Sequence, residues 1–323
     1  MQIFRRGIAA AGLAGLVVGL VVACGGGGGA NFAGIDRLGV TNGTITGFGS
    51  IFVNGVEYET GNGTSFVLDD SPGTESELRV GQVITINWVS NDNGATFRAE
   101  DVTYDKTLEG PVTSINAGAQ SFVVLGQTVV VDAGTSFDAD SGSNDLTDLA
   151  GLVVGDNVEV SGLIDATGVI RATRVERQVA GDKLEVRGIV SELTATTFNI
   201  NDQVVNYATA TLSGFSGQIA AGDFVEAKGD TVNGSGQLVA TEVKLEDEGL
   251  PSGGDGDEGE LEGFVTDFDA NSPSRFSVNG APVVTDAATE VTGGVVALNA
   301  RVEVKGIFNA VGELLADTIE IKD

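Results

Sequence analysis

Apolar and polar residues follow a rhythm that recurs four times along the chain. A motif of glycine, one variable residue and a β-branched apolar residue begins at Gly43, Gly110, Gly188 and Gly263, at spacings of 67, 78 and 75 residues. Each motif is followed by a short segment that contains a phenylalanine, by a two-residue turn and by a further apolar segment. Repetition at this period predicts tandem copies of one supersecondary unit.

A turn separates the second and third predicted strands of every copy. Asn54-Gly55 and Asn279-Gly280 lie between alternating apolar residues. Asn-Gly is the strongest short hairpin signal, because both turn positions need positive φ. Asn201-Asp202 and Leu125-Gly126 stand at the same place in the other copies, and Leu125 fits such a turn less well. We therefore predict a β-hairpin in each copy.

The fourth predicted strand of the second copy, Gly155–Gly162, alternates strictly between apolar and polar residues. This pattern predicts a half-buried strand, with Val158 and Val160 facing a core and the intervening residues facing away from it. Its counterparts are Gly222–Gly229, Asn299–Gly306 and the less regular Gly81–Trp88. Asparagine replaces glycine at Asn299, and it is the next residue type to tolerate a left-handed backbone.

A change of phase marks the fifth predicted strand. Its apolar residues are spaced by two and then by three positions, as in Phe97, Ala99 and Val102. The other copies repeat this spacing at Ile170, Ala172 and Val175, at Leu238, Ala240 and Val243, and at Leu314, Ala316 and Ile319. One extra residue in a β-bulge keeps all three side chains on one face, so we predict a bulge in each fifth strand.

Five short strands, a bulge and a longer connection between the third and fourth strands favour a small closed barrel of OB type. A β-sandwich and a continuous β-solenoid are the alternatives. The predicted fold is all-β, with four tandem five-stranded OB-like barrels at residues 40–106, 107–180, 182–246 and 260–323. We refer to these barrels as modules 1 to 4.

The joins between the modules predict how they are arranged. Short joins between modules 1, 2 and 3 favour a rod. The segment Glu246–Glu262 holds eight acids in 17 residues and no base, so we predict a flexible acidic glycine-rich linker at 247–259.

The N-terminus has the pattern of an export signal. Arg5 and Arg6 precede an uncharged apolar stretch, Gly7–Val22, of 16 residues. That stretch is short for a membrane span and typical of a signal peptide, predicted at 1–23. Val21-Val22-Ala23-Cys24 resembles the lipobox of bacterial lipoproteins, which implies lipidation of Cys24. A glycine-rich tether, 24–39, follows, and Gly25 in place of aspartate favours the outer membrane by the same resemblance.

Residues 40–323 resemble a family of secreted bacterial proteins built from tandem copies of a domain of unknown function. The motifs that carry the resemblance are Phe276–Gly280, Val154–Gly162 and Ala240–Val243. This family implies a fold and no activity, and it has no functional residues to transfer.

Composition excludes several kinds of chemistry. The chain has no histidine and a single cysteine, so Ser-His-Asp and Cys-His catalysis and ordinary zinc, haem or iron–sulfur sites lack their residues. The formal net charge of −29 opposes binding to nucleic acid. No pair of carboxylates stands out as a glycosidase site. We therefore expect no enzyme activity, no cofactor and no nucleic-acid partner.

Two features could contact a ligand. Trp88, the only tryptophan, stands at a predicted loop where it could touch a glycan or a protein, and a structural role is the alternative. Calcium prefers several oxygen ligands, which two acidic clusters offer without following the EF-hand order: Asp255, Asp257, Glu258 and Glu260, and Asp138, Asp140, Asn144 and Asp145. Loose screening by cations is the alternative to a dedicated site.

These observations predict a non-catalytic cell-envelope lipoprotein, anchored in the membrane through Cys24, that binds an envelope protein or a glycan. Loops that differ between the copies, at 89–96, 163–169, 230–237 and 307–313, would form the recognition surface. A structural spacer without a ligand is the alternative. A calcium-binding or glycan-acting envelope protein is a further one.

Overall fold

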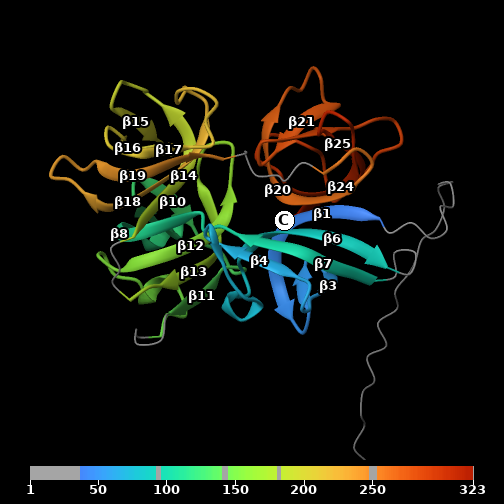
Figure 1. Ribbon diagram of the computed structural model, residues 1–323, viewed down its shortest axis with the longest axis horizontal. Coiled ribbons are helices and arrows are strands. Elements are labelled where there is room, and N and C mark those ends of the chain that lie inside the picture. Colours follow the sequence, from blue (N-terminus) through green and yellow to red (C-terminus); the bar gives the residue numbers. More distant parts are fainter. Residues whose placement is uncertain (1–36, 92–95, 140–144, 180–182, 247–252, 323) are drawn as a thin grey trace, which may run out of the picture. The chain divides into compact units, whose positions relative to one another are not determined.

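The computed structural model describes residues 37–91, 96–139, 145–179, 183–246 and 253–322 (Figure 1). Apart from three short 3₁₀ turns, Glu75–Glu77, Ala117–Ala119 and Leu149–Gly151, the regular structure of these residues is β-strand. The predicted all-β fold is therefore confirmed. Among the described residues, no helix is long and apolar enough to cross a membrane.

Each module is a closed barrel of five strands. In module 1 these are β1 (Leu38–Phe48), β2 (Ile51–Val53), β3 (Val56–Glu59), β6 (Val83–Asn91) and β7 (Thr96–Tyr104). In module 2 they are β8 (Leu108–Asn116), β9 (Ser121–Val124), β10 (Gln127–Val130), β12 (Asn157–Ile164) and β13 (Ile170–Arg177). In module 3 they are β14 (Leu184–Ser191), β15 (Thr197–Ile200), β16 (Gln203–Asn206), β18 (Phe224–Val232) and β19 (Leu238–Leu245). In module 4 they are β20 (Glu258–Phe268), β21 (Arg275–Val278), β22 (Ala281–Val284), β24 (Arg301–Phe308) and β25 (Leu314–Lys322).

All four barrels share one strand order. The first strand pairs with the second, the second with the third, the third with the fifth, the fifth with the fourth, and the fourth again with the first. The third and fifth strands run parallel, and the other neighbours run antiparallel. A short strand in the connection before the fourth strand also pairs in parallel with the fifth: β4 (Ser65–Leu68), β11 (Ser136–Ala139), β17 (Thr211–Ser213) and β23 (Glu290–Thr292). In module 1, β5 (Ser71–Pro72) forms a hairpin with β4.

The predicted turns are confirmed, and one of them explains the repeated glycine of the first strand. Asn279 has φ 48° and its side chain folds back over β20. Its Oδ1 accepts a hydrogen bond from the Phe264 N–H at 3.0 Å, and its Nδ2 donates to the Glu262 carbonyl at 3.1 Å. A Cβ atom on the intervening Gly263 would overlap this amide. Glycine at this position therefore makes room for the turn side chain.

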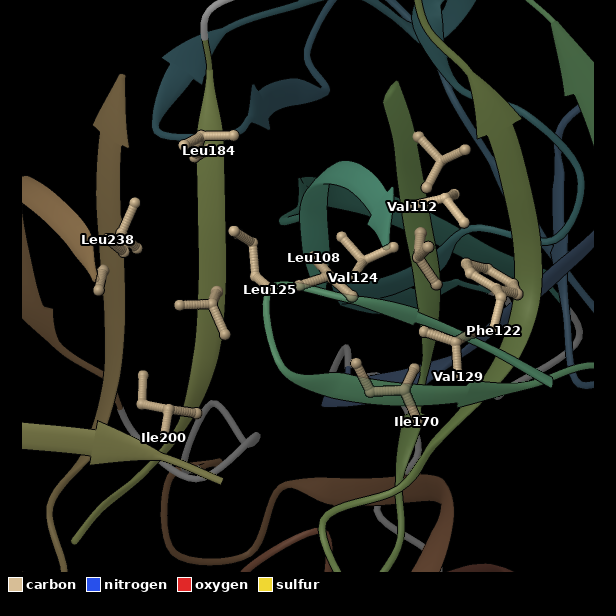
Figure 2. Close-up of a cluster of buried hydrophobic side chains, with 14 of the residues drawn as sticks. Leu108, Val112, Phe122, Val124, Leu125, Val129, Ile170, Leu184, Ile200 and Leu238 are labelled. Atoms are coloured by element: carbon tan, nitrogen blue, oxygen red, sulfur yellow. The ribbon is translucent and has the colours of Figure 1, made fainter. Parts of the chain in front are cut away.

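Leu125, the poor fit, occupies its turn with φ 43°. A non-glycine residue in this region is strained unless its surroundings hold it there. The Leu125 side chain is buried in the hydrophobic core that modules 2 and 3 share. Figure 2 shows it lying between the side chains of module 2 and the strand that carries Leu184. Burial of the leucine offsets the strain of the turn.

The predicted bulges are also confirmed, at one equivalent residue in each fifth strand. In module 4, Lys305 pairs with Thr318 and Gly306 pairs with Ala316, so that Asp317 is the extra residue. The extra residues of modules 1, 2 and 3 are Glu100, Thr173 and Thr241. Opposite the bulge stands a glycine in modules 2 to 4 and Trp88 in module 1.

The modules also hydrogen-bond to one another, through the first half of each first strand. The second strand covers only the later part of the first, so the earlier part leaves one edge without a partner from its own barrel. Residues 39–42 of β1 pair in parallel with residues 258–261 of β20. On β8 and β14, Leu108 and Glu109 pair antiparallel with Val186 and Glu185. These contacts join the described strands into one 13-stranded and one 12-stranded sheet, each holding two barrels.

This pairing corrects the predicted arrangement of the modules. Module 4 is not a separate unit beside a rod of modules 1 to 3, because its strand β20 pairs with strand β1 of module 1 (Figure 1). Glu258 and Gly259, placed in the linker by the sequence, begin strand β20. The remainder of the predicted linker includes residues 247–252, which lie outside the described residues. An unpaired strand edge needs a hydrogen-bonding partner, and that requirement outweighs the turn-forming composition of the segment.

We predict that Gly306→Ala destabilises the protein by about 1–3 kcal/mol, the usual cost of an extra group in a packed site. The new Cβ would overlap the backbone carbonyl of Leu315, which cannot rotate away. Urea unfolding followed by circular dichroism measures the change. Gly61→Ala is the control, because a Cβ there would meet no atom within 4 Å. Equal stability of the two variants would contradict the tight packing at the bulge.

Candidate ligand-binding cavity

A cavity of about 570 Å³ lies where the four modules meet. Outward-facing residues of β1, β6 and β7 form one wall. The β12–β13 hairpin of module 2, β14 and β18 of module 3, and the β21–β22 turn of module 4 complete it. The volume falls within the range of roughly 300–1,000 Å³ that is usual for small-molecule sites.

The module 1 wall is made of small neutral polar side chains. Thr85 on β6 stands in register between Asn42 on β1 and Thr103 on β7. The Asn42 Nδ2 donates to the Thr85 hydroxyl at 3.1 Å. Asn87 lies two residues further along β6, on the same face. In the described part of the chain, the Asn87 amide and the Thr103 hydroxyl make no hydrogen bond, so both are free to bind a ligand.

The equivalent face of the fourth strand is used differently in the other modules. Thr85 and Asn87 correspond to Glu159 and Ser161 in module 2, to Glu226 and Lys228 in module 3, and to Glu303 and Lys305 in module 4. The sequence pattern predicts that this face points away from a core and into solvent. In modules 2 and 3 that expectation is wrong, because a neighbouring module covers the face.

Two contacts show how module 1 covers module 2. The Tyr104 hydroxyl donates to Glu159 Oε1 at 2.7 Å, and the Val83 N–H donates to Ser161 Oγ at 2.8 Å. Ser161 and Glu226 each retain only 1% of their surface. The outer face of the fourth strand therefore packs against another module in modules 2 and 3, whereas in module 1 it borders the cavity.

Apolar side chains of modules 2 and 3 also line the cavity: Ile164 at the end of β12, Ile189 on β14 and Phe224 on β18. Ile189 is 54% exposed, so its side chain is accessible from the cavity. The lining thus combines the neutral polar side chains of module 1 with apolar side chains of modules 2 and 3, which stand beside the charged Arg187 and Glu246.

The β12–β13 turn of module 2 holds modules 3 and 4 at the cavity rim. Asp165 Oδ1 accepts hydrogen bonds from the backbone N–H groups of Thr167 and Val169, which fixes the turn. The Ala166 N–H donates to Asn299 Oδ1 of module 4 at 2.8 Å. The carbonyl of Gly168 accepts from Asn201 Nδ2 of module 3 at 3.1 Å.

Charged groups at one end of the cavity compensate one another. Arg187 donates through Nε to Glu226 Oε1 at 3.0 Å and lies 3.7 Å from Asp105 and 3.8 Å from Glu246. Behind it, Lys228 lies 3.0 Å from Glu226, 2.7 Å from Asp70 and 3.3 Å from Asp69. Of the same two aspartates of module 1, Lys106 binds Asp69 and Lys244 binds Asp70. This ionic cluster ties the β4–β5 hairpin of module 1 to module 3.

Two buried carboxyl groups in the cluster ionise unequally. Burial and the charge of Glu226 raise the pKa of Glu185 well above its usual value. Burial opposes the ionisation of Glu226 as well, but the charge of Arg187 and hydrogen bonds from Glu185 and Arg187 hold its pKa below the usual value. Of the two carboxyl groups, Glu185 is therefore the one that holds its proton to higher pH. Carboxylate oxygens of Asp69, Glu185 and Glu226 lie within 4.8 Å of one another, and the ammonium group of Lys228 already occupies this site.

The residues predicted from the sequence lie elsewhere. Cys24 and the signal peptide lie outside the described residues. Trp88 is not at a loop: it stands in β6 with 5% exposure, packs edge-to-face on Phe97 at 4.8 Å and donates through Nε1 to Thr41 Oγ1 at 3.1 Å. The prediction of a surface contact is wrong for Trp88, because the strand continues through this residue and its alternation places Trp88 on the core face with Ile84 and Ile86.

Four of the acidic candidates for calcium have protein contacts of their own: Asp257, Glu258, Glu260 and Asp138. Asp257 Oδ2 accepts from the Gly254 N–H at 2.6 Å, Glu258 binds Arg37, and Glu260 lies 3.2 Å from Lys305. No contact of Asp255 with these three is found among the described residues. In the second cluster, Asp138 binds Arg174 at 2.8 Å, and residues 140–144 lie outside the described residues.

The predicted recognition loops are less variable than their sequences suggest. Asp165, Asn233 and Asn309 each accept two backbone hydrogen bonds in the same way, and each turn has a glycine with φ near 80° three residues later. The fourth–fifth strand turns of modules 2 to 4 therefore share one conformation. The cavity residues were missed, and the available signal was the neutral Thr85 and Asn87 in the less regular copy of the fourth strand.

Comparison with known proteins agrees with the repeated fold. A family model described as a domain of unknown function (DUF5666) matches residues 40–103, 109–176, 187–244 and 262–320. A search of the curated proteins finds no match. The four matches cover more than half of the chain and coincide with the four barrels.

We predict that Glu185→Gln stabilises the protein at neutral pH. A carboxyl group whose pKa is raised by folding favours the folded state at pH values below its unfolded pKa of about 4.3, where it is protonated. That stabilisation is lost as the pH rises through the folded-state pKa. Glutamine keeps a donor for Glu226 and does not titrate. Its advantage should grow above pH 4.3 by up to about 1.4 kcal/mol per pH unit.

Urea unfolding at several pH values measures this difference. Glu57→Gln, at an exposed position of module 1, is the matched control and should leave the profile unchanged. A Glu185→Gln profile parallel to that of the unmodified protein would contradict the raised pKa of Glu185.

Proposed function

The chain belongs to the DUF5666 family, a family of unknown function, and we propose that it is a non-catalytic binding protein whose ligand occupies the cavity between the four modules. One observation carries the proposal. The wall formed by Asn42, Thr85, Asn87 and Thr103 presents the unpaired Asn87 amide and Thr103 hydroxyl to a cavity that apolar side chains also line. Convergent polar groups in a largely apolar cavity are the usual form of a small-molecule site.

The proposed location is the cell envelope. The charged segment at Arg5-Arg6, the apolar stretch after it and the lipobox-like Val21-Val22-Ala23-Cys24 support a lipid anchor at Cys24. Several acyl chains on one residue bind a membrane much more firmly than one chain. Gly25 after the cysteine favours the outer membrane. The membrane is then one partner, and an envelope glycan or protein is the other.

The proposal of OB-type barrels rests on the strand order. A five-stranded Greek-key barrel with a long connection before the fourth strand is the OB arrangement. The absence of histidine and the single cysteine support a non-catalytic role. The net charge of −29 supports the exclusion of nucleic acid.

A structural spacer is the second candidate. The hydrogen bonds that join module 1 to module 4 and module 2 to module 3 favour it, because they would keep the barrels in fixed positions. A spacer needs no ligand, so the two functions differ in what the cavity does.

We predict that filling the cavity abolishes ligand binding. The probe is a library of small charged and neutral fragments, with binding measured by saturation-transfer NMR. Thr103→Tyr places a ring in the cavity from the polar wall, and Ile189→Trp does so from the apolar wall. Both should weaken the fragments that bind the unmodified protein at least tenfold, about 1.4 kcal/mol.

Thr128→Tyr is the control, because Thr128 is exposed on β10 of module 2 and does not line the cavity. Fragments that bind all of the variants equally, or no binding to the unmodified protein, would overturn the proposal and leave the spacer.

A further inference from the structure

The cavity has properties that select the chemical class of its ligand. We propose that it binds a short neutral saccharide, with sugar hydroxyls on the wall of Asn42, Asn87 and Thr103 and the apolar face of a ring against Ile189 and Phe224. This inference rests on the proposed function and makes it more specific. Three independent observations lead to it.

The first observation is the charge of the lining. The chain carries a net charge of −29, yet each charged side chain that lines the cavity has an opposite charge within 4 Å. Asp165 pairs with Arg171 at 3.0 Å and Glu246 with Lys244 at 2.8 Å, while Asp105 and Arg187 lie 3.7 Å apart. An ionic ligand would find no unpaired counter-charge and would lose its hydration. The lining therefore favours an uncharged ligand.

The second observation is the kind of hydrogen bond that the polar wall offers. The Asn87 amide and the Thr103 hydroxyl each provide both a donor and an acceptor, and Asn42 Oδ1 provides an acceptor beside them. A hydroxyl group also donates and accepts, so a ligand with several hydroxyls satisfies this wall without leaving a polar atom unpaired. In modules 2, 3 and 4 the residue equivalent to Thr85 is a glutamate, which would place a charge on this wall.

The third observation is the apolar part of the lining. Phe224 and the exposed Ile189 add apolar surface to the cavity that the polar wall borders. The rings of sugars have such a division, with hydroxyls at the edge and C–H groups on the face. Burial of that face would add hydrophobic stabilisation in proportion to its area.

A peptide fits the cavity less well. Extended peptides bind proteins most readily by adding a strand to a free sheet edge. The strand at the centre of the polar wall, β6, pairs with β1 on one side and with β7 on the other, so its backbone has no edge to offer.

The experiment is titration calorimetry of the protein, residues 25–323, with neutral disaccharides and trisaccharides of glucose, galactose, mannose and N-acetylglucosamine. Matched uronic-acid disaccharides and a neutral tripeptide are the comparison probes. We expect at least one neutral saccharide to bind and the uronic acids to bind at least tenfold more weakly.

The variants test the placement of the ligand. Asn87→Ala and Thr103→Val should each weaken binding of the saccharide by five- to 100-fold, because each removes a hydrogen-bonding group from the polar wall. Thr128→Val, at the exposed position on β10, should leave the affinity unchanged. Circular dichroism and the unfolding midpoint confirm that each variant is folded.

The outcomes separate the two proposals. If no saccharide binds while the tripeptide or other fragments bind and are lost in Thr103→Tyr, the cavity is a binding site and the saccharide class is wrong. Uronic acids that bind as tightly as the neutral sugars would overturn the argument from charge. If no probe of any class responds to Thr103→Tyr, the binding function itself fails.

Discussion

Each barrel leaves part of one strand edge unpaired, and the arrangement of the whole molecule follows from that edge. The first strand is longer than the second strand that should cover it, so its initial residues present backbone N–H and C=O groups without partners from their own barrel. Exposed edges of this kind invite association with other chains. Here the edges of β1 and β20 satisfy each other, and so do those of β8 and β14. These pairings join the barrels in two pairs, and contacts such as those of Tyr104 with Glu159 and of Ala166 with Asn299 link the two pairs around the cavity.

Repetition of one unit produced four surfaces with different roles. The outer face of the fourth strand packs against another module where it carries Glu159 or Glu226, and it borders the cavity where it carries Thr85. A glutamate that becomes buried needs a donor or a cation, which Tyr104 and Arg187 supply. Module 1 has no such requirement, because its residues on this face are neutral. The residues at two positions of the fourth strand therefore decide whether its outer face packs against another module or borders the candidate site.

The charge of the chain is partly structural. A net charge of −29 indicates a solvated acidic surface, and many acids do lie there. The cluster around Lys228 is different, because its carboxylates come from modules 1 and 3 and are buried together. Removing one member of a buried ion pair leaves the other without a partner, which commonly costs about 3–5 kcal/mol. Lys228 and Lys244 of module 3 thus join it to module 1 through Asp69 and Asp70.

Local geometry could be predicted from the sequence. The alternation of apolar residues gave the strands, the turn dipeptides gave the hairpins, and the two-then-three spacing gave the bulge in all four copies. These features depend on residues close together in the chain, whose side chains must reach the same core with a period of two. Asn299 and Leu125 show the limit, since burial and neighbours decide whether a poor residue is accepted at positive φ.

The relation between the barrels was decided only by the tertiary structure. Nothing in the periodicity distinguishes a polar side chain facing water from one facing another barrel, so Glu226 and Ser161 were expected in solvent and are buried. Trp88 was expected at the surface and lies in a core. The sequence by itself determined four five-stranded units and their turns, because those follow from local alternation and backbone chirality. Which edges pair, and therefore which side chains surround the cavity, depends on contacts between residues more than 200 positions apart, such as Thr41 and Glu260.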